Sequence, residues 1–346
     1  MRLSYTKYRL KCTHPFGISR SSYDYYDRIF IYLEQDGFIG RGEAAPSERY
    51  NESIAQILER LKNNIFLPNI VSNINDVIEI INGYTFNIKS LRSAFINALF
   101  DWWTQKQELP LHEYFGFKEK ISKPTSFTIA LGELEDLESK IIEAEPYRIL
   151  KVKLGTENDK KIINEIRKYT SKTIRVDANE GWNLETAIEM CGWLSKQNVE
   201  FIEQPLPASD FDKMVELKTH SKLPLIADEN CIVSADIEKL VKGFDGINIK
   251  LAKCGGLDEA LRMVTITKRY NLKIMFGCMM ESSIGIAAIT QIASQADYLD
   301  IDGRLLIDND PYHGLEIVNG IPLLSNCNGI GLSLRNNYKN EFPELK

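Results

Sequence analysis

The chain has 346 residues, of which 44% are hydrophobic and 26% are charged, and its formal net charge is −6. This composition is ordinary for a globular protein, and the acidic balance argues against nucleic acid or a membrane surface as a partner. No apolar run approaches the length that spans a bilayer, and the amino terminus lacks the apolar core of a signal peptide. We therefore expect a cytoplasmic protein whose six scattered cysteines are reduced thiols.

The first third of the chain, residues 1–120, has the pattern of an α+β module. Alternating polar and apolar residues are typical of antiparallel strands, and apolar residues three and four apart are typical of helices. These patterns predict strands over 3–13 and 28–34, a loop over 14–27, a turn over 37–42, and helices over 53–62 and 90–106.

From residue 121 to 313 the chain alternates between short apolar strands and helices. Eight such repeats are typical of a parallel (β/α) barrel. Strands are predicted over 127–131, 148–154, 173–177, 199–203, 223–228, 246–250, 272–277 and 298–301. We expect the tail, 314–346, to fold back on the first module, so that the two units pack as one rigid body.

Three acidic residues follow three consecutive predicted strands. Asp177, Glu203 and Asp228 are 26 and 25 residues apart, which is about one strand, loop and helix each time. A single acid at a strand end also fits a loop cap or a salt bridge, but three in register converge on one point. Their hard oxygens suit Mg²⁺, whereas no histidine or paired-cysteine spacing near them suits zinc. The sequence therefore predicts a magnesium site.

Lysines accompany these acids at the same edge of the barrel. Lys151 and Lys153 share one face of their strand, and two buried ammonium groups are costly unless they have a function. The alternative is a solvent-facing Lys-Val-Lys on an edge strand. Lys250 ends a strand across the barrel mouth, with Lys253 as its near competitor. A base on each face of a substrate carbon can take a proton from one side and return one on the other.

These motifs resemble the enolase superfamily, and within it the muconate-lactonizing subgroup with two lysine bases. Members of the superfamily combine a Lys or His base with magnesium. The predicted seventh strand ends without a histidine, which speaks against the mandelate racemase subgroup. The resemblance covers nearly the whole chain and rests on the segments 40–46, 151–153, 177–179, 203–205, 227–229, 248–250, 254–256 and 277–285.

The resemblance implies a fold, a cofactor and residue roles. The fold is a modified (β/α)8 barrel of the (β/α)7β type, with an α+β capping domain formed by the N-terminal segment and the tail. Mg²⁺, with Mn²⁺ as a substitute, would be bound by Asp177, Glu203 and Asp228. Lys153 and Lys250 would be the bases, and Lys151 would help to bind the substrate carboxylate. We also expect a homo-oligomer.

The eighth strand carries the feature that separates reactions within this superfamily. Alternation puts Asp300 and Asp302 on one side, and in dipeptide epimerases an Asp-x-Asp at this place holds the free α-ammonium of the substrate. The alternative is a pair of loop-capping acids. Positions that line the dipeptide in that family are matched by Thr128, Cys278, Met279 and Met280. We therefore expect an isomerase that epimerises the C-terminal α-carbon of a small dipeptide.

The preferred dipeptide and the rival interpretations stay open at this point. Arg20, between the first two strands, could pair with a Glu side chain, as in an L-Ala-D/L-Glu epimerase of cell-wall peptide recycling. Tyr23, Tyr25 and Tyr26 would instead suit an apolar or aromatic side chain. One rival is an o-succinylbenzoate synthase or N-acylamino acid racemase, whose substrates carry no free ammonium. The other is a catalytically inactive relative, which would have lost a base or a metal ligand.

Overall fold

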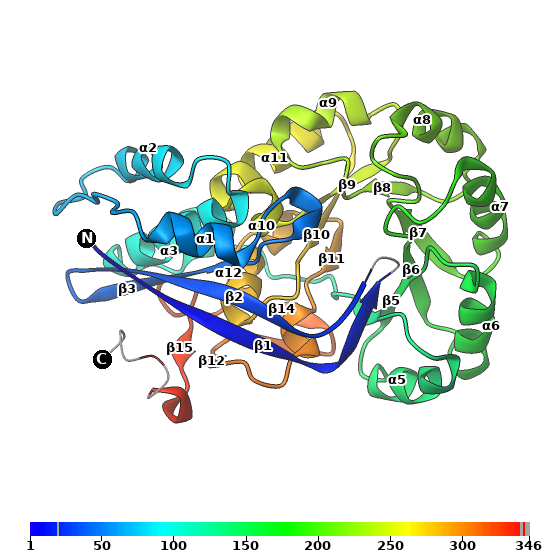
Figure 1. The fold of residues 1–346 in the computed structure, drawn as a ribbon, viewed down its shortest axis with the longest axis horizontal. Coiled ribbons are helices and arrows are strands. Elements are labelled where there is room, and N and C mark those ends of the chain that lie inside the picture. The colour runs from blue at the N-terminus through cyan, green and yellow to red at the C-terminus, as the bar shows by residue number, and fades with distance from the viewer. Residues whose placement is uncertain (19–20, 340–341, 343–346) are drawn as a thin grey trace.

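A computed structural model describes residues 1–18, 21–339 and 342 of the chain. Figure 1 shows two parts side by side: a barrel rimmed by helices, and a smaller cap built on a long hairpin. The hairpin strands are β1 (Arg2–Ile18) and β2 (Ser21–Gln35), and they run from the N-terminus to the barrel near β5. The predicted fold class, a barrel with an α+β cap, is confirmed.

The barrel is an eight-stranded parallel sheet whose strand order follows the chain. A bridge between Thr125 and Leu299 joins the first strand to the last and closes the sheet. The strands are β4 (Phe127–Ile129), β5 (Ile149–Lys153), β6 (Thr173–Asp177), β7 (Val199–Glu203), β8 (Leu225–Ala227), β9 (Gly246–Ile249), β10 (Lys273–Gly277) and β11 (Tyr298–Asp300). All eight lie within the predicted ranges, because strands buried on both faces are short apolar runs.

A helix follows each of the first seven strands, and these helices cover the outside of the sheet (Figure 1). In the described part of the chain, β11 is followed by a 3₁₀ turn, η5 (Gly303–Leu306), and by no α-helix, which gives the (β/α)7β arrangement. The helices are α5 (Leu137–Glu143), α6 (Asp159–Tyr169), α7 (Leu184–Leu194), α8 (Phe211–His220), α9 (Ile237–Leu240), α10 (Leu251–Cys254), α11 (Leu257–Arg269) and α12 (Ser283–Thr290).

The cap packs its antiparallel sheet on one long helix. β3 (Phe38–Ala44) pairs with β2 and crosses α3 (Lys89–Lys106). A Cβ at Gly42 would lie 1.8 Å from the main-chain oxygen of Ala94 in α3, so this close approach requires glycine. The other cap helices are α1 (Ile54–Leu61), α2 (Ile74–Thr85) and α4 (Leu111–Tyr114). The two predicted cap helices are thus confirmed, and α2 and α4 were missed.

Two sequence expectations for the cap are wrong. The predicted loop over 14–27 is mostly strand, because pairing resumes beyond a register shift between Lys11 and Phe16. Tyrosines favour extended strands, and a register shift lets pairing continue past an irregular segment. The predicted turn over 37–42 is also mostly strand, namely β3. Arg20 lies outside the described residues.

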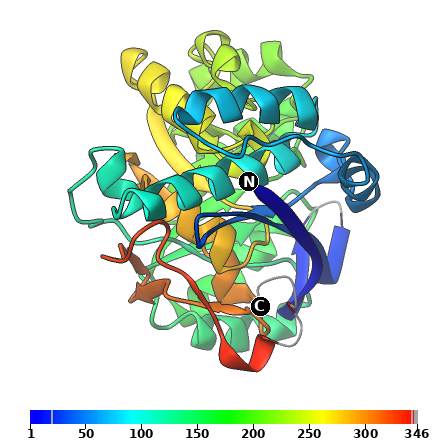
Figure 2. The same ribbon diagram turned by 90° about the vertical axis from the view of Figure 1, so that its left-hand side faces the viewer.

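The tail takes part in two small two-stranded sheets and contacts both parts of the molecule. β12 (Tyr312–His313) pairs with β15 (Ser333–Leu334), and β13 (Glu316–Val318) pairs with β14 (Ile321–Leu323). Figure 2 shows the tail, in orange to red, crossing the cap end of the molecule. In the tail, Ile330 N donates a hydrogen bond to Asp101 Oδ1 in α3 of the cap (2.9 Å). Gly320 O accepts a hydrogen bond from Thr125 N, which lies just before β4 of the barrel (2.8 Å). The domain boundaries at 120 and 313 stay predictions.

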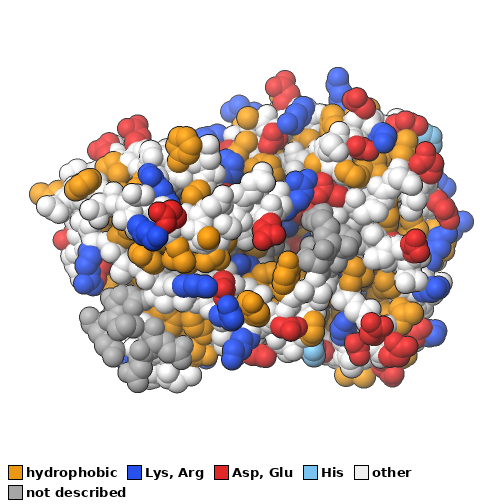
Figure 3. All heavy atoms as spheres, in the orientation of Figure 1, with side chains coloured by type: hydrophobic (Ala, Val, Ile, Leu, Met, Phe, Trp, Pro, Cys, Tyr) orange, Lys and Arg blue, Asp and Glu red, His pale blue; other side chains and the backbone are white. Residues whose placement is uncertain are grey.

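The surface is consistent with the composition. Figure 3 shows Lys and Arg side chains interspersed with Asp and Glu side chains over one face of the molecule. Within the described ranges, no helix combines the length and the apolar character needed to cross a bilayer.

Asp101 offers a test of how the tail and the cap sheet are held together. Its buried carboxylate accepts hydrogen bonds from Arg41 N in β3 and from Ile330 N in the tail, both at 2.9 Å. Asp101→Ala leaves two buried donors unsatisfied, so we expect it to lower the free energy of unfolding by about 2 to 4 kcal/mol in urea denaturation. Glu79→Ala, on the exposed side of α2, is the control and should change it by less than about 0.5 kcal/mol. A loss below about 1 kcal/mol for Asp101→Ala would contradict this account.

Candidate active site

A pocket of about 550 Å³ lies between the cap and the C-terminal ends of the barrel strands. The cap contributes the hairpin and the 3₁₀ turn η1 (Glu48–Tyr50), and the barrel contributes the strand ends and the loops that follow them. Thirteen of the residues singled out from the sequence line this pocket: Tyr23, Tyr25, Tyr26, Thr128, Lys151, Lys153, Asp228, Lys250, Cys278, Met279, Met280, Asp300 and Asp302.

Three carboxylates meet at the barrel side of the pocket. Asp177 and Glu203 end β6 and β7 and are paired in register, and Asp228 follows β8 directly. All three are buried, and one oxygen of each lies within 4.8 Å of the others. The strand period of the barrel therefore produces the convergence that the sequence predicted.

The three acids fit a hard divalent cation. Burial and the neighbouring carboxylate of Asp177 raise the pKa of Glu203 to about 8, because negative charges held this close repel one another. Other contacts orient the carboxylates: Asn248 Nδ2 donates to Glu203 Oε1 (2.7 Å), and Asn179 N donates to Asp177 Oδ1 (2.9 Å). An all-oxygen set of three oriented acids matches the preference of Mg²⁺.

Lys151 lies at the centre of the charged cluster. Its ammonium is 2.6 Å from Glu203 Oε2, 2.6 Å from Asp300 Oδ2 and 3.1 Å from Asp177 Oδ2. Burial lowers the pKa of this lysine, but the surrounding carboxylates outweigh burial and hold it well above its ordinary value. The sequence assigned Lys151 to the substrate carboxylate. The structure places its ammonium between the three-acid cluster and Asp300.

Two further lysines reach the pocket from opposite sides of the barrel. Lys153 Nζ is 2.7 Å from Asp177 Oδ2, and Lys250 Nζ is 2.7 Å from Asp228 Oδ2. Lys153 is on β5 and Lys250 follows β9, four strands further along a sheet of eight. Lys253 is fully buried and donates only to protein oxygens of Asp228 and Asn248. Lys250, and not its competitor Lys253, therefore faces the pocket.

The two acids at the end of the eighth strand differ in their surroundings. Asp300 accepts from Ser126 Oγ (2.6 Å) and pairs with Lys151, so its charge is already balanced. Asp302 lies two residues beyond, at the start of η5, and accepts from Thr128 N (2.7 Å). Burial and the nearby charge of Asp300 raise the pKa of Asp302 to about 6. Asp302 is therefore the acid that gains more from a cationic ligand group.

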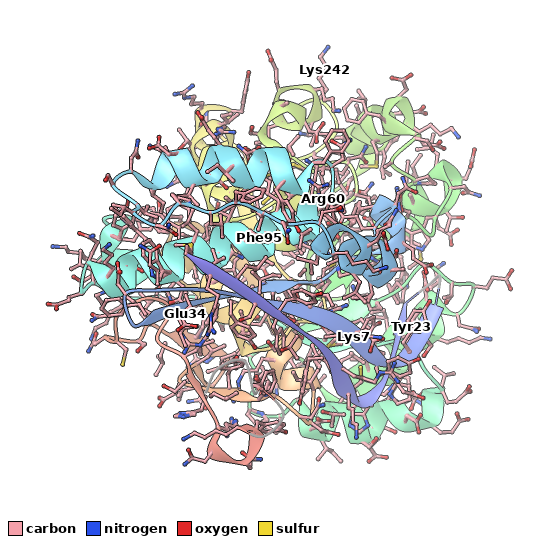
Figure 4. The ribbon with its side chains drawn as sticks, turned by 60° about the vertical axis from the view of Figure 1, so that its left-hand side comes forward. Lys7, Tyr23, Glu34, Arg60, Phe95 and Lys242 are labelled. Atoms are coloured by element: carbon pink, nitrogen blue, oxygen red, sulfur yellow. The ribbon has the colours of Figure 1, made fainter. Side chains whose placement is uncertain are left out.

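Aromatic and sulfur-containing residues form the wall that the cap completes. Phe16, Tyr23, Tyr25 and Tyr26 line the pocket from the hairpin, opposite Met279 and Met280 after β10. Tyr23 lies near the barrel end of the hairpin in Figure 4, and its ring contacts that of Tyr26 edge to face at 5.7 Å.

Arg28 is a buried cation of the hairpin that also borders this wall. Its Nε donates to Met280 O (2.7 Å), and its Nη1 donates to Asp27 O (2.9 Å). Burial lowers the pKa of Arg28, while the nearby carboxylates of Glu43 and Glu281 oppose that shift.

Sequence reasoning missed the residues that η1 brings over the site. Arg49 makes a two-pronged ion pair with Glu180 (2.7 Å for both contacts), which ties the cap to the loop after β6. Tyr50 lines the pocket, and burial together with Asp228 and Glu229 holds its pKa well above the ordinary value. Glu229, which also lines the pocket, could have been identified from the sequence because it directly follows Asp228. No local signal marked Arg49 or Tyr50, because they enter the site only through packing of the cap.

Comparisons with known proteins agree with this geometry. Residues 133–338 match the family described as Enolase C-terminal domain-like. The chain is 40% identical over 340 residues to an L-Ala-D/L-amino acid epimerase of Maribacter sp., which covers 96% of this chain and 99% of that protein. It is 37% identical over 336 residues to an L-Ala-D/L-amino acid epimerase of Flavobacterium johnsoniae, covering 96% of this chain and 100% of that protein.

A solved structure shows the same fold. A dipeptide epimerase from Cytophaga hutchinsonii, complexed with Mg and the dipeptide D-Ala-L-Val, superimposes with a TM-score of 0.90 at 25% identity. The match covers 98% of this chain and 97% of that one. The chain therefore belongs to the enolase superfamily, and the relatives named above are epimerases of that superfamily.

Proposed function

We propose that this chain is a magnesium-dependent dipeptide epimerase that inverts the α-carbon of the C-terminal residue. The observation that carries the proposal is the placement of Lys153 and Lys250. They enter one pocket from opposite sides of the barrel, and each is paired with an acid of the three-carboxylate cluster. A substrate carbon between them would have a proton acceptor on one face and a proton donor on the other.

The chemistry requires a means of stabilising negative charge. Removing a proton beside a carboxylate makes a dianionic enolate, which lysine alone cannot generate at a useful rate. Asp177, Glu203 and Asp228 would hold the Mg²⁺, which when bound neutralises the charge that develops on the substrate carboxylate. Lys151 adds a further cation at the same place.

The proton then moves between the two lysines and the α-carbon. In one direction, neutral Lys153 takes the proton and the ammonium of Lys250 returns one to the opposite face. In the other direction the roles exchange. One C–H bond breaks and one C–H bond forms on the opposite face of the same carbon. The reaction therefore inverts the carbon and needs no redox partner.

Asp302 supports the choice of a dipeptide over an N-acylated amino acid. A buried ammonium is unfavourable unless it is paired, and a substrate with its carboxylate at the acid cluster would carry its amino group elsewhere. Asp302 lines the same pocket and is not paired with a lysine within the described residues. Asp300 instead supports Lys151.

The hairpin wall supports an apolar or aromatic second side chain. Its tyrosines and the methionines after β10 offer apolar surface, and Arg28, which lines the same pocket, already donates to the main-chain oxygens of Met280 and Asp27. A Glu side chain would bury a carboxylate there, which is unfavourable without a dedicated partner. A role in cell-wall peptide recycling, a cytoplasmic location and a homo-oligomeric state stay predictions.

A dipeptide library in D₂O tests the function directly. With Mg²⁺ present, mass spectrometry should find one deuterium gained at the C-terminal α-carbon of L-Ala dipeptides. The value of kcat/KM should be at least about tenfold higher for L-Ala-L-Phe and L-Ala-L-Leu than for L-Ala-L-Glu. Chelation should abolish exchange, and Mg²⁺ or Mn²⁺, but not Zn²⁺, should restore it. Exchange confined to N-acylamino acids, or dehydration of a succinylbenzoate precursor, would assign the chain to a different reaction.

The two lysines should act on opposite stereoisomers. We expect Lys153→Ala and Lys250→Ala each to reduce epimerisation by about 10²- to 10⁴-fold, because each variant lacks one acid–base group. Each variant should still exchange the α-proton of one isomer in D₂O, and the two should retain opposite isomers. Lys222→Ala, at an exposed lysine of the barrel, is the control. Near-parental epimerisation by Lys250→Ala would show that another residue is the second base.

Asp302 should determine whether a free amino group is required. Asp302→Asn removes the charge but keeps the size, so we expect KM for free dipeptides to rise about 10- to 100-fold. N-acetylated dipeptides should be poor substrates of the parent protein, and the variant should discriminate less between the two forms. Asp308→Asn, an exposed acid outside the pocket, is the matched control. Equal turnover of free and N-acetylated dipeptides by the parent would refute the role of Asp302.

A further inference from the structure

Lys253 is a buried cation that the proposed reaction does not use. Its side chain is completely inaccessible to solvent, and it follows Lys250 by one turn in α10. Its ammonium donates to Asp228 Oδ1 (2.6 Å), to Asp228 O (2.7 Å) and to Asn248 O (2.8 Å). A lysine ammonium has three protons, so these contacts account for all of its donors.

Lys253 contacts one of the three clustered acids directly and is linked to a second one through Asn248. It holds Asp228 by both a side-chain and a main-chain oxygen, while the other carboxylate oxygen, Oδ2, pairs with Lys250 on the pocket side. It also holds the main chain of Asn248, whose side-chain amide donates to Glu203 Oε1 (2.7 Å). One buried ammonium thus links the ends of β8 and β9 and, through Asn248, the acid of β7.

The turn that presents Lys253 is itself fixed by the cap. Arg92 in α3 donates to Gly255 O (2.6 Å) and pairs with Asp258 (2.7 Å). Gly255 has a φ of 103° and Gly256 a φ of 124°, and a Cβ at Gly256 would lie 2.8 Å from Ile96 in α3. Such backbone angles favour glycine, so α10 can lie directly against the cap helix. The cap therefore holds the segment from which Lys253 reaches the acids.

We propose that Lys253 is a positioning residue of the metal site, which orients Asp228 and, through Asn248, Glu203 toward a divalent cation. The proposal rests on the metal requirement of the proposed function but assigns Lys253 no part in proton transfer. Residues that hydrogen-bond to metal ligands and orient them typically raise the affinity for the metal 10- to 100-fold. A neutral side chain at 253 would leave one carboxylate oxygen and two main-chain oxygens without this donor.

Metal binding, measured without substrate, tests the proposal. Mg²⁺ alone is titrated calorimetrically into the parent, Lys253→Met, Asn248→Ala and Lys242→Met. Lys253→Met should raise the Kd for Mg²⁺ about 10- to 100-fold, and Asn248→Ala should raise it less, because only the link to Glu203 is lost. Lys242 is exposed and points away from the body of the molecule in Figure 4, so Lys242→Met should bind as the parent does.

Isotope exchange separates positioning from catalysis. Lys253→Met should lower α-proton exchange by the same factor for both stereoisomers, because one metal site serves both directions. The Mn²⁺ spectrum measured by electron paramagnetic resonance should also change in Lys253→Met and not in Lys242→Met. Loss of exchange for one isomer only would make Lys253 a base and overturn the proposal.

Three further outcomes are decisive. An unchanged Kd for Mg²⁺ in Lys253→Met overturns the proposal. An unchanged Kd in Asn248→Ala overturns the part of it that runs through Asn248 to Glu203, and this result does not depend on whether Lys253→Met folds. A parent protein that binds Mg²⁺ but exchanges no dipeptide proton refutes the proposed function, while the comparison of Kd values still tests the role of Lys253.

Discussion

Compensation of buried charge at one end of the barrel is the constraint on which the rest of the structure depends. Four acids and four lysines lie within hydrogen-bonding reach of one another there, and neither set could be buried alone without a large desolvation cost. The acids are Asp177, Glu203, Asp228 and Asp300, and the lysines are Lys151, Lys153, Lys250 and Lys253. A cluster of this kind favours binding of a cation and a carboxylate together, because the two added charges have opposite signs.

The cap completes the pocket that contains the cluster. The barrel strands position the acids and lysines, but the walls of the pocket come partly from the hairpin and η1. Arg28 joins the hairpin to the loop after β10, and the pair Arg49–Glu180 joins η1 to the loop after β6. The walls of the pocket are therefore partly formed by segments separate from the strand ends that carry the acids and lysines, which is consistent with one site serving several reactions in a superfamily.

The elements that could be predicted from the sequence are those whose pattern lies in neighbouring residues of the chain. The barrel strands were found because each is a short apolar run at a regular period, and the acids at their ends share that period. The hairpin was predicted too short because its pairing continues past an irregular register between Lys11 and Phe16. Local composition there resembled a loop, while cross-strand pairing and packing on the barrel stabilised strands.

The sequence by itself determined the barrel, the three clustered acids and the presence of lysines at the same edge, because strand alternation and repeat spacing place these side chains without reference to distant contacts. Only the tertiary structure determined which of these charged side chains pair with one another. It paired Lys151 with Asp300, left Asp302 as the acid without a lysine in the described chain, and buried Lys253 behind Asp228 while Lys250 faced the pocket. These choices depend on distances between residues far apart in the chain, since burial and Coulomb attraction act through space and not along the sequence.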